Sequence, residues 1–409
     1  MIRNALTLLV AVALPAAAAD LVFVGGTIHT LVDAKPSTVE ALAIDDGAVV
    51  AAGSHAEVEG HVDDTTRVVE LDGATVVPGL VDAHAHLHSL GAMLASVDLR
   101  GATSAAECID RARQRHGELP EGAWLIGRAW DQNDWDVQDY PTAAMLDAAF
   151  GDRPVYFERV DGHASWVSSA ALRLGGIDAD TPDPQGGEIL RDPSTGEATG
   201  ILIDEADTHV LDAMPEPSDE EIEQRYRRAV QACVEVGITG VHDMGVDLRE
   251  LEVLRRGERE GWLDLRVVVY LAGDPTLQEY EGSRAGTDPS SRVRVEGVKL
   301  YADGALGSRG AALLEDYSDR PGHRGLLLHE PEVLQQQIER VFERRLGLAV
   351  HAIGDRANHV VLDRIVAGHA AVSARDASLP PLSELNARIE HAQIVHPDDL
   401  RRFAEHDIL

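Results

Sequence analysis

The chain has 409 residues, 44% of them hydrophobic, which suffices for two domains or for one large barrel with additions. Acidic residues outnumber lysine and arginine by 70 to 36, so the formal net charge is −34. This acidity argues against nucleic acid as a partner and would attract cations, including metals. Solubility or salt adaptation is the explanation that we favour for it.

Residues 1–19 have the pattern of a secretory signal peptide. Arg3 supplies a positive charge, residues 5–14 are apolar but too few to span a bilayer comfortably, and residues 17–19 form an Ala-Ala-Ala cleavage site. An uncleaved anchor is the alternative. No second hydrophobic run of spanning length follows, so we expect a periplasmic or secreted protein that leaves the membrane after cleavage. An oxidising compartment would permit a disulfide, yet we expect Cys108 and Cys233 to be buried free thiols.

Residues 20–75 alternate short apolar runs with Gly and Asp-Gly turns. Such a pattern predicts β-hairpins, with strands inside residues 21–31, 40–53 and 66–79. These residues therefore form a small β-unit in front of the segment that follows.

The segment VVPGLVDAHAHLH, residues 76–88, joins an apolar run and a Pro-Gly to four alternating polar residues. Side chains at i and i+2 share one face of a strand, so His84 and His86 should point the same way. Two neutral imidazoles on one face can hold a divalent ion. The alternative is a run of solvated or hydrogen-bonded histidines.

Residues 100–225 hold four of the five tryptophans, between Trp124 and Trp166. Asp131 directly follows Trp130, and a polar tip flanked by aromatic residues is typical of a pocket wall, although aromatic clusters are more often core. A strand is expected at 154–160, ending near His163, and a hairpin at 186–206. His163 is a candidate for substrate contact or for a structural hydrogen bond.

From residue 218 onward, predicted helices and strands alternate, which favours a parallel sheet and, with eight such units, a TIM barrel. The helices are expected at 220–236, 248–261, 332–346 and 357–371 and from 397, and the strands at 238–244, 265–272, 295–302, 347–353 and 387–393. Residues 100–225 would then be an insertion after the first barrel strand.

Three further polar residues lie where predicted strands end, at Lys299, His351 and His391. Barrel active sites gather at these carboxyl ends, so the three should join His84 and His86. The chain contains only two lysines, Lys35 and Lys299, and otherwise uses arginine. A buried lysine can lose its proton whereas arginine cannot, which suggests amine chemistry at Lys299.

The strings PGLVDAHAHL, GRAWDQNDW, KLYADGALGSR, HAIGDRA and RIEHAQ resemble the amidohydrolase superfamily, in the branch called amidohydrolase 3 or YtcJ-like. The resemblance runs from Leu21 to the last residue. It implies an α/β fold, with a TIM-type (β/α)8 barrel over 76–409, incomplete here. It also implies a small β-sandwich begun by residues 20–75.

The resemblance implies one or two divalent metal ions, with zinc expected, held by His84, His86, His351 and His391. Lys299 would bridge two ions as a carbamate; a single-metal site, or a buried ion pair between Lys299 and Asp303, is the alternative. His163 and Arg309 would contact substrate, unless Arg309 forms only a surface salt bridge. Strand alternation predicts that Glu390 faces away from the metal. Asp355 is expected to cap the following helix or to support a ligand.

The resemblance also implies an Asp at the end of an eighth strand, which binds metal and takes the proton from the attacking water. No such Asp or strand is found in these residues, and the strands that would complete the β-sandwich are missing too. We therefore hypothesise that the sequence is a C-terminally incomplete copy. A natural 409-residue product with efficient turnover would contradict this hypothesis.

The resemblance thus implies hydrolysis of a non-peptide C–N bond, in an amide, cyclic amide or formamide, by a metal-activated water. An ester or lactone hydrolase on the same metals is one alternative, and a truncated, non-catalytic metal- or ligand-binding scaffold is another. We expect a small-molecule substrate and no nucleic-acid or membrane partner, and self-association into a homo-oligomer stays open.

Overall fold

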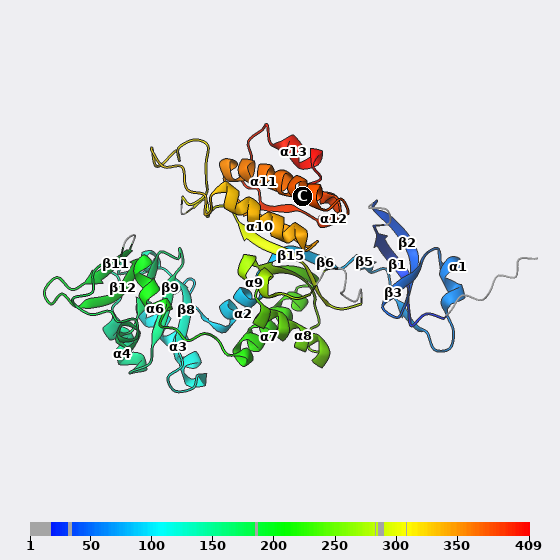
Figure 1. The fold of residues 1–409 in the computed structure, drawn as a ribbon. Coiled ribbons are helices and arrows are strands. Elements are labelled where there is room, and N and C mark those ends of the chain that lie inside the picture. The colour runs from blue at the N-terminus through cyan, green and yellow to red at the C-terminus, as the bar shows by residue number, and fades with distance from the viewer. Residues whose placement is uncertain (1–17, 32–34, 185–186, 283, 285–289, 308) are drawn as a thin grey trace, which may run out of the picture. The chain divides into compact units, whose positions relative to one another are not determined.

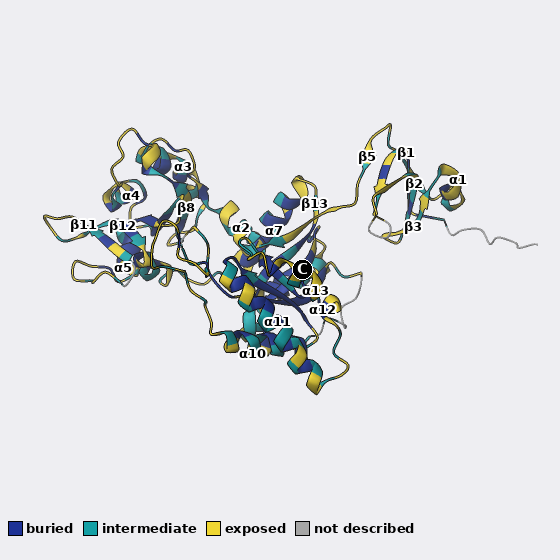
Figure 2. Ribbon diagram, turned by 90° about the horizontal axis from the view of Figure 1, so that it is seen from above, coloured by how far each residue is buried: buried dark blue, intermediate teal, exposed yellow. Residues whose placement is uncertain are grey.

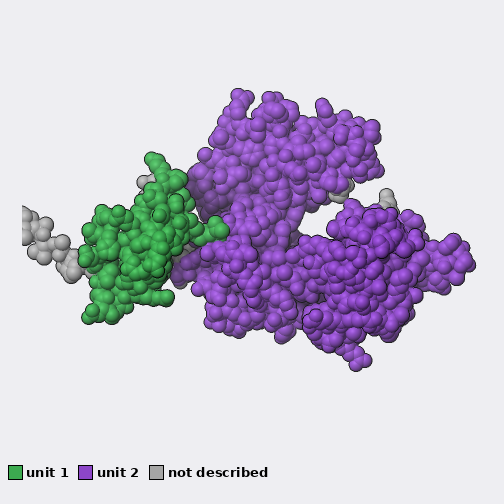
Figure 3. Space-filling view, turned by 180° about the vertical axis from the view of Figure 1, so that it is seen from behind, with its two compact units in different colours: residues 1–80 green, residues 81–409 purple. Residues whose placement is uncertain are grey.

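The computed structural model describes residues 18–31, 35–184, 187–282, 284, 290–307 and 309–409. Most of the predicted signal peptide, residues 1–17, lies outside the described residues. The chain forms two compact units, Met1–Leu80 and Val81–Leu409, which Figure 3 colours separately. In the part of the chain that is described, no helix has both the length and the apolar character needed to cross a membrane.

The first unit contains one five-stranded sheet in the order β3-β2-β1-β4, with β5 also paired to β1. β2 runs antiparallel to β1 and β3, whereas β4 and β5 are parallel to β1. The Asp46-Gly47 turn between β2 and β3 has positive φ at both residues, as a tight hairpin requires. The elements are β1 (Leu21–Thr30), β2 (Ser37–Asp45), β3 (Ala48–Gly53), α1 (His55–Val58), β4 (Arg67–Glu70) and β5 (Thr75–Val76).

The second unit contains a near-closed barrel sheet of six strands in the order β17-β16-β15-β14-β13-β6 (Figure 1). Neighbouring strands from β13 to β17 are parallel, so their carboxyl ends meet at one edge. The predicted TIM-type fold is confirmed. Its strands are β6 (Leu80–Ala85), β13 (Ile238–Val246), β14 (Arg266–Ala272), β15 (Val293–Tyr301), β16 (Gly347–Ala352) and β17 (Arg388–His391).

Helices follow the barrel strands and carry one buried and one exposed face (Figures 1 and 2). Local sequence fixes where two of them begin, because Ser218 with Glu221 and Asp247 with Glu250 form capping boxes. The helices are α2 (Leu87–Ala95), α7 (Asp219–Glu235), α8 (Leu248–Glu260), α9 (Gly273–Glu279), α10 (Pro331–Glu343), α11 (Asp355–Arg375), α12 (Leu382–Leu385) and α13 (Leu400–Glu405).

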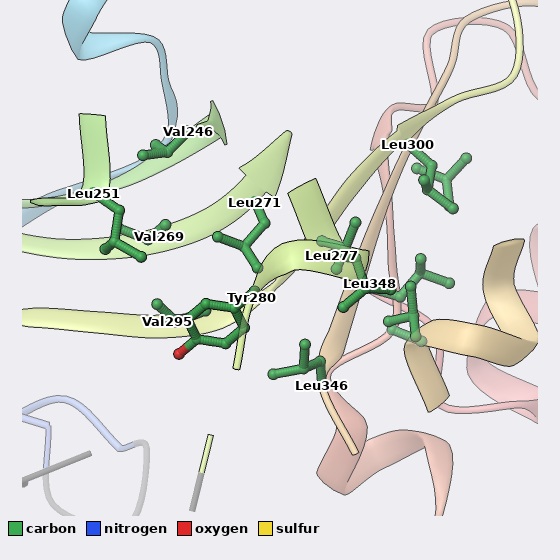
Figure 4. Close-up of a cluster of buried hydrophobic side chains, with 14 of the residues drawn as sticks. Val246, Leu251, Val269, Leu271, Leu277, Tyr280, Val295, Leu300, Leu346 and Leu348 are labelled. Carbon is green, nitrogen blue, oxygen red and sulfur yellow. The ribbon is translucent and has the colours of Figure 1, made fainter. Parts of the chain in front are cut away.

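Aliphatic side chains from strands and helices form the main core of the barrel. Figure 4 shows Val269 and Leu271 of β14 near Val295 of β15, with Leu277 of α9 and Leu348 of β16 beside them. All five are less than 6% exposed. This core holds the strands in register and so places their polar ends.

Between β6 and α7 the chain builds a second six-stranded sheet, β11-β12-β10-β9-β8-β7, with a separate aromatic core. Trp130, Trp135, Trp166 and Phe157 pack together in it. Its elements are β7 (Val97–Asp98), α3 (Ala105–Glu118), β8 (Leu125–Trp130), α4 (Ala143–Phe150), β9 (Val155–Arg159), β10 (Ala164–Val167), α5 (Ser169–Leu174), β11 (Gly187–Arg191), β12 (Ala198–Asp204) and α6 (Thr208–Leu211).

Both cysteines are buried and free, as the sequence predicts. Cys108 lies in α3 and Cys233 in α7. Burial raises the pKa of the Cys108 thiol to about 12, so this thiol stays protonated and unreactive.

The contact between α2 and α7 generates a test of the packing that supports the first barrel strand. A Cβ at Gly91 of α2 would lie 1.9 Å from the Arg225 carbonyl oxygen of α7, whereas a Cβ at Gly117 of α3 would meet nothing within 4 Å. We expect Gly91→Ala to lower the free energy of unfolding by about 1–3 kcal/mol through overpacking. Gly117→Ala should raise it by up to about 1 kcal/mol through helix propensity. Denaturant titration measures both, and a Gly91→Ala protein as stable as wild type would contradict the packing.

Candidate active site

Four imidazole rings gather at the carboxyl ends of β6, β16 and β17. The His84 ring lies 5.2 Å from that of His86 and 4.8 Å from that of His391, and the rings of His351 and His391 are 4.6 Å apart, between centroids. Lys299 of β15 lies beside them, because its amine is 4.6 Å from the Tyr301 ring centroid and that ring is 5.6 Å from the His351 ring. All five predicted ligands are thus brought together, although the outermost two, His84 and His391, lie 307 positions apart in the sequence.

The backbone at the end of β17 leaves the regular strand conformation. His391 and Ala392 have φ of 72° and 39°, in the left-handed region that residues other than glycine rarely adopt. This turn of the backbone brings His391 into the ring cluster. Glu390, which strand alternation predicted to face away, also faces the cluster and contacts the Nδ1 of His84. That prediction was wrong because alternation fails where the strand ends.

The two histidines of β6 each use Nδ1 for a hydrogen bond to the protein. Nδ1 of His84 donates to the Glu390 carboxylate, and Nδ1 of His86 donates to the Met244 carbonyl oxygen at 2.8 Å. These bonds favour the tautomer in which Nε2 carries a lone pair. Both rings therefore present a basic nitrogen of the kind that binds a metal.

Lys299 is 1% exposed and lies 4.6 Å from the Tyr301 ring centroid. Burial lowers the pKa of its amine to about 8, although the charge of Glu390 opposes the shift. Among the described residues no ion pair includes Lys299, so the alternative of a buried pair with Asp303 is not formed. Near pH 7 the charged amine still predominates, but a larger share is neutral and nucleophilic than for an exposed lysine.

Asp303 instead organises the loop beside His351. Its carboxylate accepts hydrogen bonds from the backbone of Ala312, Ile353 and Gly354 at 2.8–2.9 Å, and one oxygen lies 3.5 Å from Nε2 of His351. That nitrogen is buried and has no hydrogen-bond partner in the described structure. Buried polar atoms rarely stay unpaired, so this nitrogen indicates a missing ligand.

Electrostatics keep three histidines of the cluster neutral. Burial lowers the pKa of His86, His351 and His391, in the last case to about 4, and the neighbouring His and Lys299 charges add to the effect. Neutral imidazole is the form that ligates a metal, so these three rings need no deprotonation near pH 7.

Bond lengths of 2.0–2.1 Å and a tetrahedral angle would place the centroids of two zinc-bound imidazoles about 5 Å apart. The separations of the His84, His86, His351 and His391 rings fit this value. Across the described residues, however, no group of three or more His, Cys, Asp or Glu side chains is already arranged to coordinate one ion. The donors fit a metal in type and spacing, and closing around it would require small side-chain movements.

The other predicted contacts do not reach this cluster. Trp130 is fully buried, and its indole nitrogen donates to the Phe157 carbonyl oxygen, so its side chain has no exposed surface for substrate contact. Asp131 accepts from the backbone and side chain of Asn133 as a local cap. His163 is half exposed and pairs with Asp204 at 2.7 Å. Arg309 forms the surface salt bridge that the sequence left open, with Asp319 at 2.8 Å.

Two residues of the motifs have supporting rather than ligating positions. His88 pairs with Glu250 at 2.6 Å and with Arg225, away from the ring cluster. Asp355 is the first residue of α11 rather than its N-cap, and it accepts from the backbone of Leu314 and Arg356. Both hold the loops and helices that follow the site strands.

Sequence reasoning assigned no role to two polar residues beneath the cluster, Asp243 and Arg388, and misplaced a third, Glu390. Asp243 is 2% exposed and accepts the backbone N–H of Leu87, directly after His86. Burial raises its pKa to about 7. Arg388 and Glu390 bring a buried charge pair to the base of the site. Their only sequence signal is a charged residue inside an apolar strand.

Comparison with known proteins decides the family. A model described as the amidohydrolase family matches residues 67–408. The chain belongs to this family. This amidohydrolase is 34% identical over 391 residues to the putative amidohydrolase YtcJ of Bacillus subtilis, which places it in the predicted branch. It is 33% identical to the protein LONG AFTER FAR-RED 3 of Arabidopsis thaliana and 29% identical to the N-substituted formamide deformylase of Arthrobacter pascens.

The matches cover nearly all of this amidohydrolase but only part of its relatives. It is covered to 93%, 95% and 94%, yet it spans 70%, 66% and 71% of those three proteins, or about two thirds of their length. Crystal structures of uncharacterised metal-dependent hydrolases from Pyrococcus horikoshii and Pyrococcus furiosus superpose with a TM-score of 0.76, at 29% and 30% identity. They cover 95% of this chain, which covers 73% and 75% of theirs.

The buried amine generates a prediction with a defined sign. Folding lowers the pKa of Lys299 from 10.5 to about 8, because the folded protein disfavours the charged amine. The free energy of unfolding therefore falls as the pH drops from about 10.5 to 8, and it stays lower at more acidic pH. In metal-free, carbonate-free buffer at pH 7, we expect Lys299→Met to be more stable than wild type by roughly 1–3 kcal/mol. The difference should vanish near pH 10.5. Denaturant titration at both pH values measures it, and a less stable variant at pH 7 would contradict the buried, unpaired amine.

Proposed function

We propose that this protein is a metal-dependent hydrolase of a non-peptide C–N bond in a small amide, cyclic amide or formamide. One observation carries the proposal: His84, His86, Lys299, His351 and His391 meet at one edge of the barrel, three of the histidines with a lowered pKa. Membership of the amidohydrolase family supports it, as do the metal-dependent hydrolases that share the fold. The resemblance to a formamide deformylase favours formamides within this class.

In the proposed site, the four histidines bind one or two divalent ions, with zinc as the expected metal. When bound, the metal supplies an electrophile for the carbonyl oxygen and a more acidic water. Hydrogen bonds to Glu390 and Met244 orient His84 and His86 toward it. The lowered pKa of the Lys299 amine suits it to become a bridging carbamate, because only the unprotonated fraction adds carbon dioxide.

Tyr301 gives the proposed site an apolar wall. The residue is 42% exposed, and its ring centroid lies 4.6 Å from the Lys299 amine and 5.6 Å from the His351 ring centroid. An exposed aromatic ring beside buried polar groups suits a substrate with an apolar substituent near its reacting bond. This arrangement supports a substrate with an apolar substituent, such as an N-substituted amide or formamide.

Two alternatives remain as candidates. An ester or lactone hydrolase would use the same ligands, and a non-catalytic scaffold would bind metal or ligand without turnover. We also propose that the protein is exported to the periplasm or beyond, acts on a small molecule without a nucleic-acid or membrane partner, and can self-associate. The predicted cleavage site at residues 17–19 and the net charge of −34 support export and solubility.

Metal removal and ligand substitution test the proposal together. Dialysis of the full chain against a chelator should abolish hydrolysis of an N-substituted formamide, and added Zn²⁺ should restore it. His351→Asn should lower kcat/KM by at least about 10³-fold because it removes a ligand from the reacting centre. His29→Asn, at an exposed position of β1 in the first unit, serves as the matched control and should have no effect. Full activity with less than a tenth of an equivalent of metal would contradict the proposal.

A substrate panel distinguishes the alternatives. We expect the highest kcat/KM for N-substituted formamides or cyclic amides and weaker turnover of matched esters and lactones. A reversed order would favour the esterase, and a full complement of bound zinc with no turnover of any substrate would favour the scaffold.

A further inference from the structure

Arg388 and Glu390 are two residues apart on β17 and share the face that points into the barrel. Glu390 is buried, with 4% of its side chain exposed, and Arg388 is partly buried, with 15% exposed. They form an ion pair with each other, and Arg388 Nη2 donates to Glu390 Oε2 at 3.1 Å. Desolvating a buried charge pair costs free energy, which further hydrogen bonds to the two side chains must offset.

The Glu390 carboxylate oxygen that accepts from Arg388 also accepts from Nδ1 of His84. A carboxylate at Nδ1 fixes the tautomer of an imidazole, holds its ring plane and makes Nε2 more basic. His84 and Arg388 thus direct N–H groups at the same carboxylate, an arrangement in which an anionic acceptor forms its strongest hydrogen bonds.

Arg388 extends this arrangement to three more strands. Its guanidinium donates to the Ala83 carbonyl oxygen of β6 at 2.8 Å, and contacts Nδ1 of His242 on β13 at 3.0 Å. It also lies 5.6 Å from the ring centroid of Tyr270 on β14. β6 and β17 are the two outer strands of the described barrel sheet. One side chain thus links both edges of the sheet immediately beside His84.

From these contacts we propose that Arg388 and Glu390 are positioning residues for His84: Arg388 anchors Glu390 to β6, and Glu390 holds His84 as the Nδ1–H tautomer with Nε2 directed into the ring cluster. The metal-affinity part of this inference rests on the proposed function, whereas the tautomer part does not. Neither residue touches the substrate in this account. They act on the site only by setting the orientation and the basicity of His84.

The chain provides a matched control in the same segment. Glu250 contacts Nδ1 of His88 at 2.6 Å and is 8% exposed, so it is also a buried carboxylate on a histidine of residues 76–88. His88, however, stacks against Tyr226 and lies outside the ring cluster. Glu250→Gln therefore reproduces the chemical change of Glu390→Gln without reaching a candidate ligand.

The experiment measures two quantities on the full-length protein. Nitrogen-15 NMR of the metal-free protein reports the His84 tautomer, with the signal assigned by its loss in His84→Gln. Competition with a chromogenic chelator measures the affinity for Zn²⁺. Far-UV circular dichroism confirms that each variant is folded.

We expect Glu390→Met, which removes the acceptor, to shift His84 to a mixture of tautomers and to weaken Zn²⁺ binding about 10–100-fold. Glu390→Gln keeps an acceptor but loses the charge, so it should preserve the tautomer and weaken binding by less. Arg388→Met, which releases Glu390 from β6, should also weaken Zn²⁺ binding, and Glu250→Gln should change neither quantity.

An unchanged His84 tautomer in folded Glu390→Met would overturn the proposal. If Glu390→Met fails to fold, the two glutamine variants are compared. Equal Zn²⁺ affinities for Glu390→Gln and Glu250→Gln would overturn the proposal. A loss of Zn²⁺ affinity in Glu390→Gln alone would support it. If the wild-type protein binds no Zn²⁺, that result contradicts the proposed function and not the role of Glu390. The tautomer measurement on metal-free protein would then still decide the role of Glu390.

Discussion

The hydrogen bond between His84 and Glu390 joins the first barrel strand to the last described one, and the rest of the site depends on it. It requires β6 and β17 to approach each other although they are at opposite ends of the strand order. The parallel strands between them meet that requirement by curling into a near-closed sheet, filled inside by the apolar core. Fold and chemistry are therefore linked through one contact, since a sheet that opened would separate His84 from His391 as well.

Burial sets the charge states of this site. In a low-dielectric interior the ionised form of an unpaired group is disfavoured, and this effect lowers the pKa of Lys299 and of three clustered histidines. Glu390 stays ionised because His84 and Arg388 stabilise its anion. The result is three neutral imidazoles, and an amine that loses its proton more readily than an exposed lysine does, beside one fixed negative charge. Such a set favours a cation arriving from solution over a proton.

Much of the fold and the ligand set could be predicted from the sequence, because they follow local rules. The helix–strand alternation after residue 218 identified five parallel strands, and the spacing of His84 and His86 placed both on one face. The predictions failed where a local rule was broken or where contacts are distant in sequence. Strand alternation misplaced Glu390 because His391 adopts a left-handed backbone. Trp130 fits a pocket wall by sequence but packs into a core that draws on residues up to Ile201.

The central claim is that the residues at the ends of β6, β15, β16 and β17 form one metal site. Anomalous diffraction at the zinc absorption edge, from crystals of the full chain grown with Zn²⁺, tests this most directly. The account predicts one or two strong peaks within bonding distance of Nε2 of His84 and His86 and of the rings of His351 and His391. Well-ordered crystals with zinc bound elsewhere and no peak among these rings would contradict it.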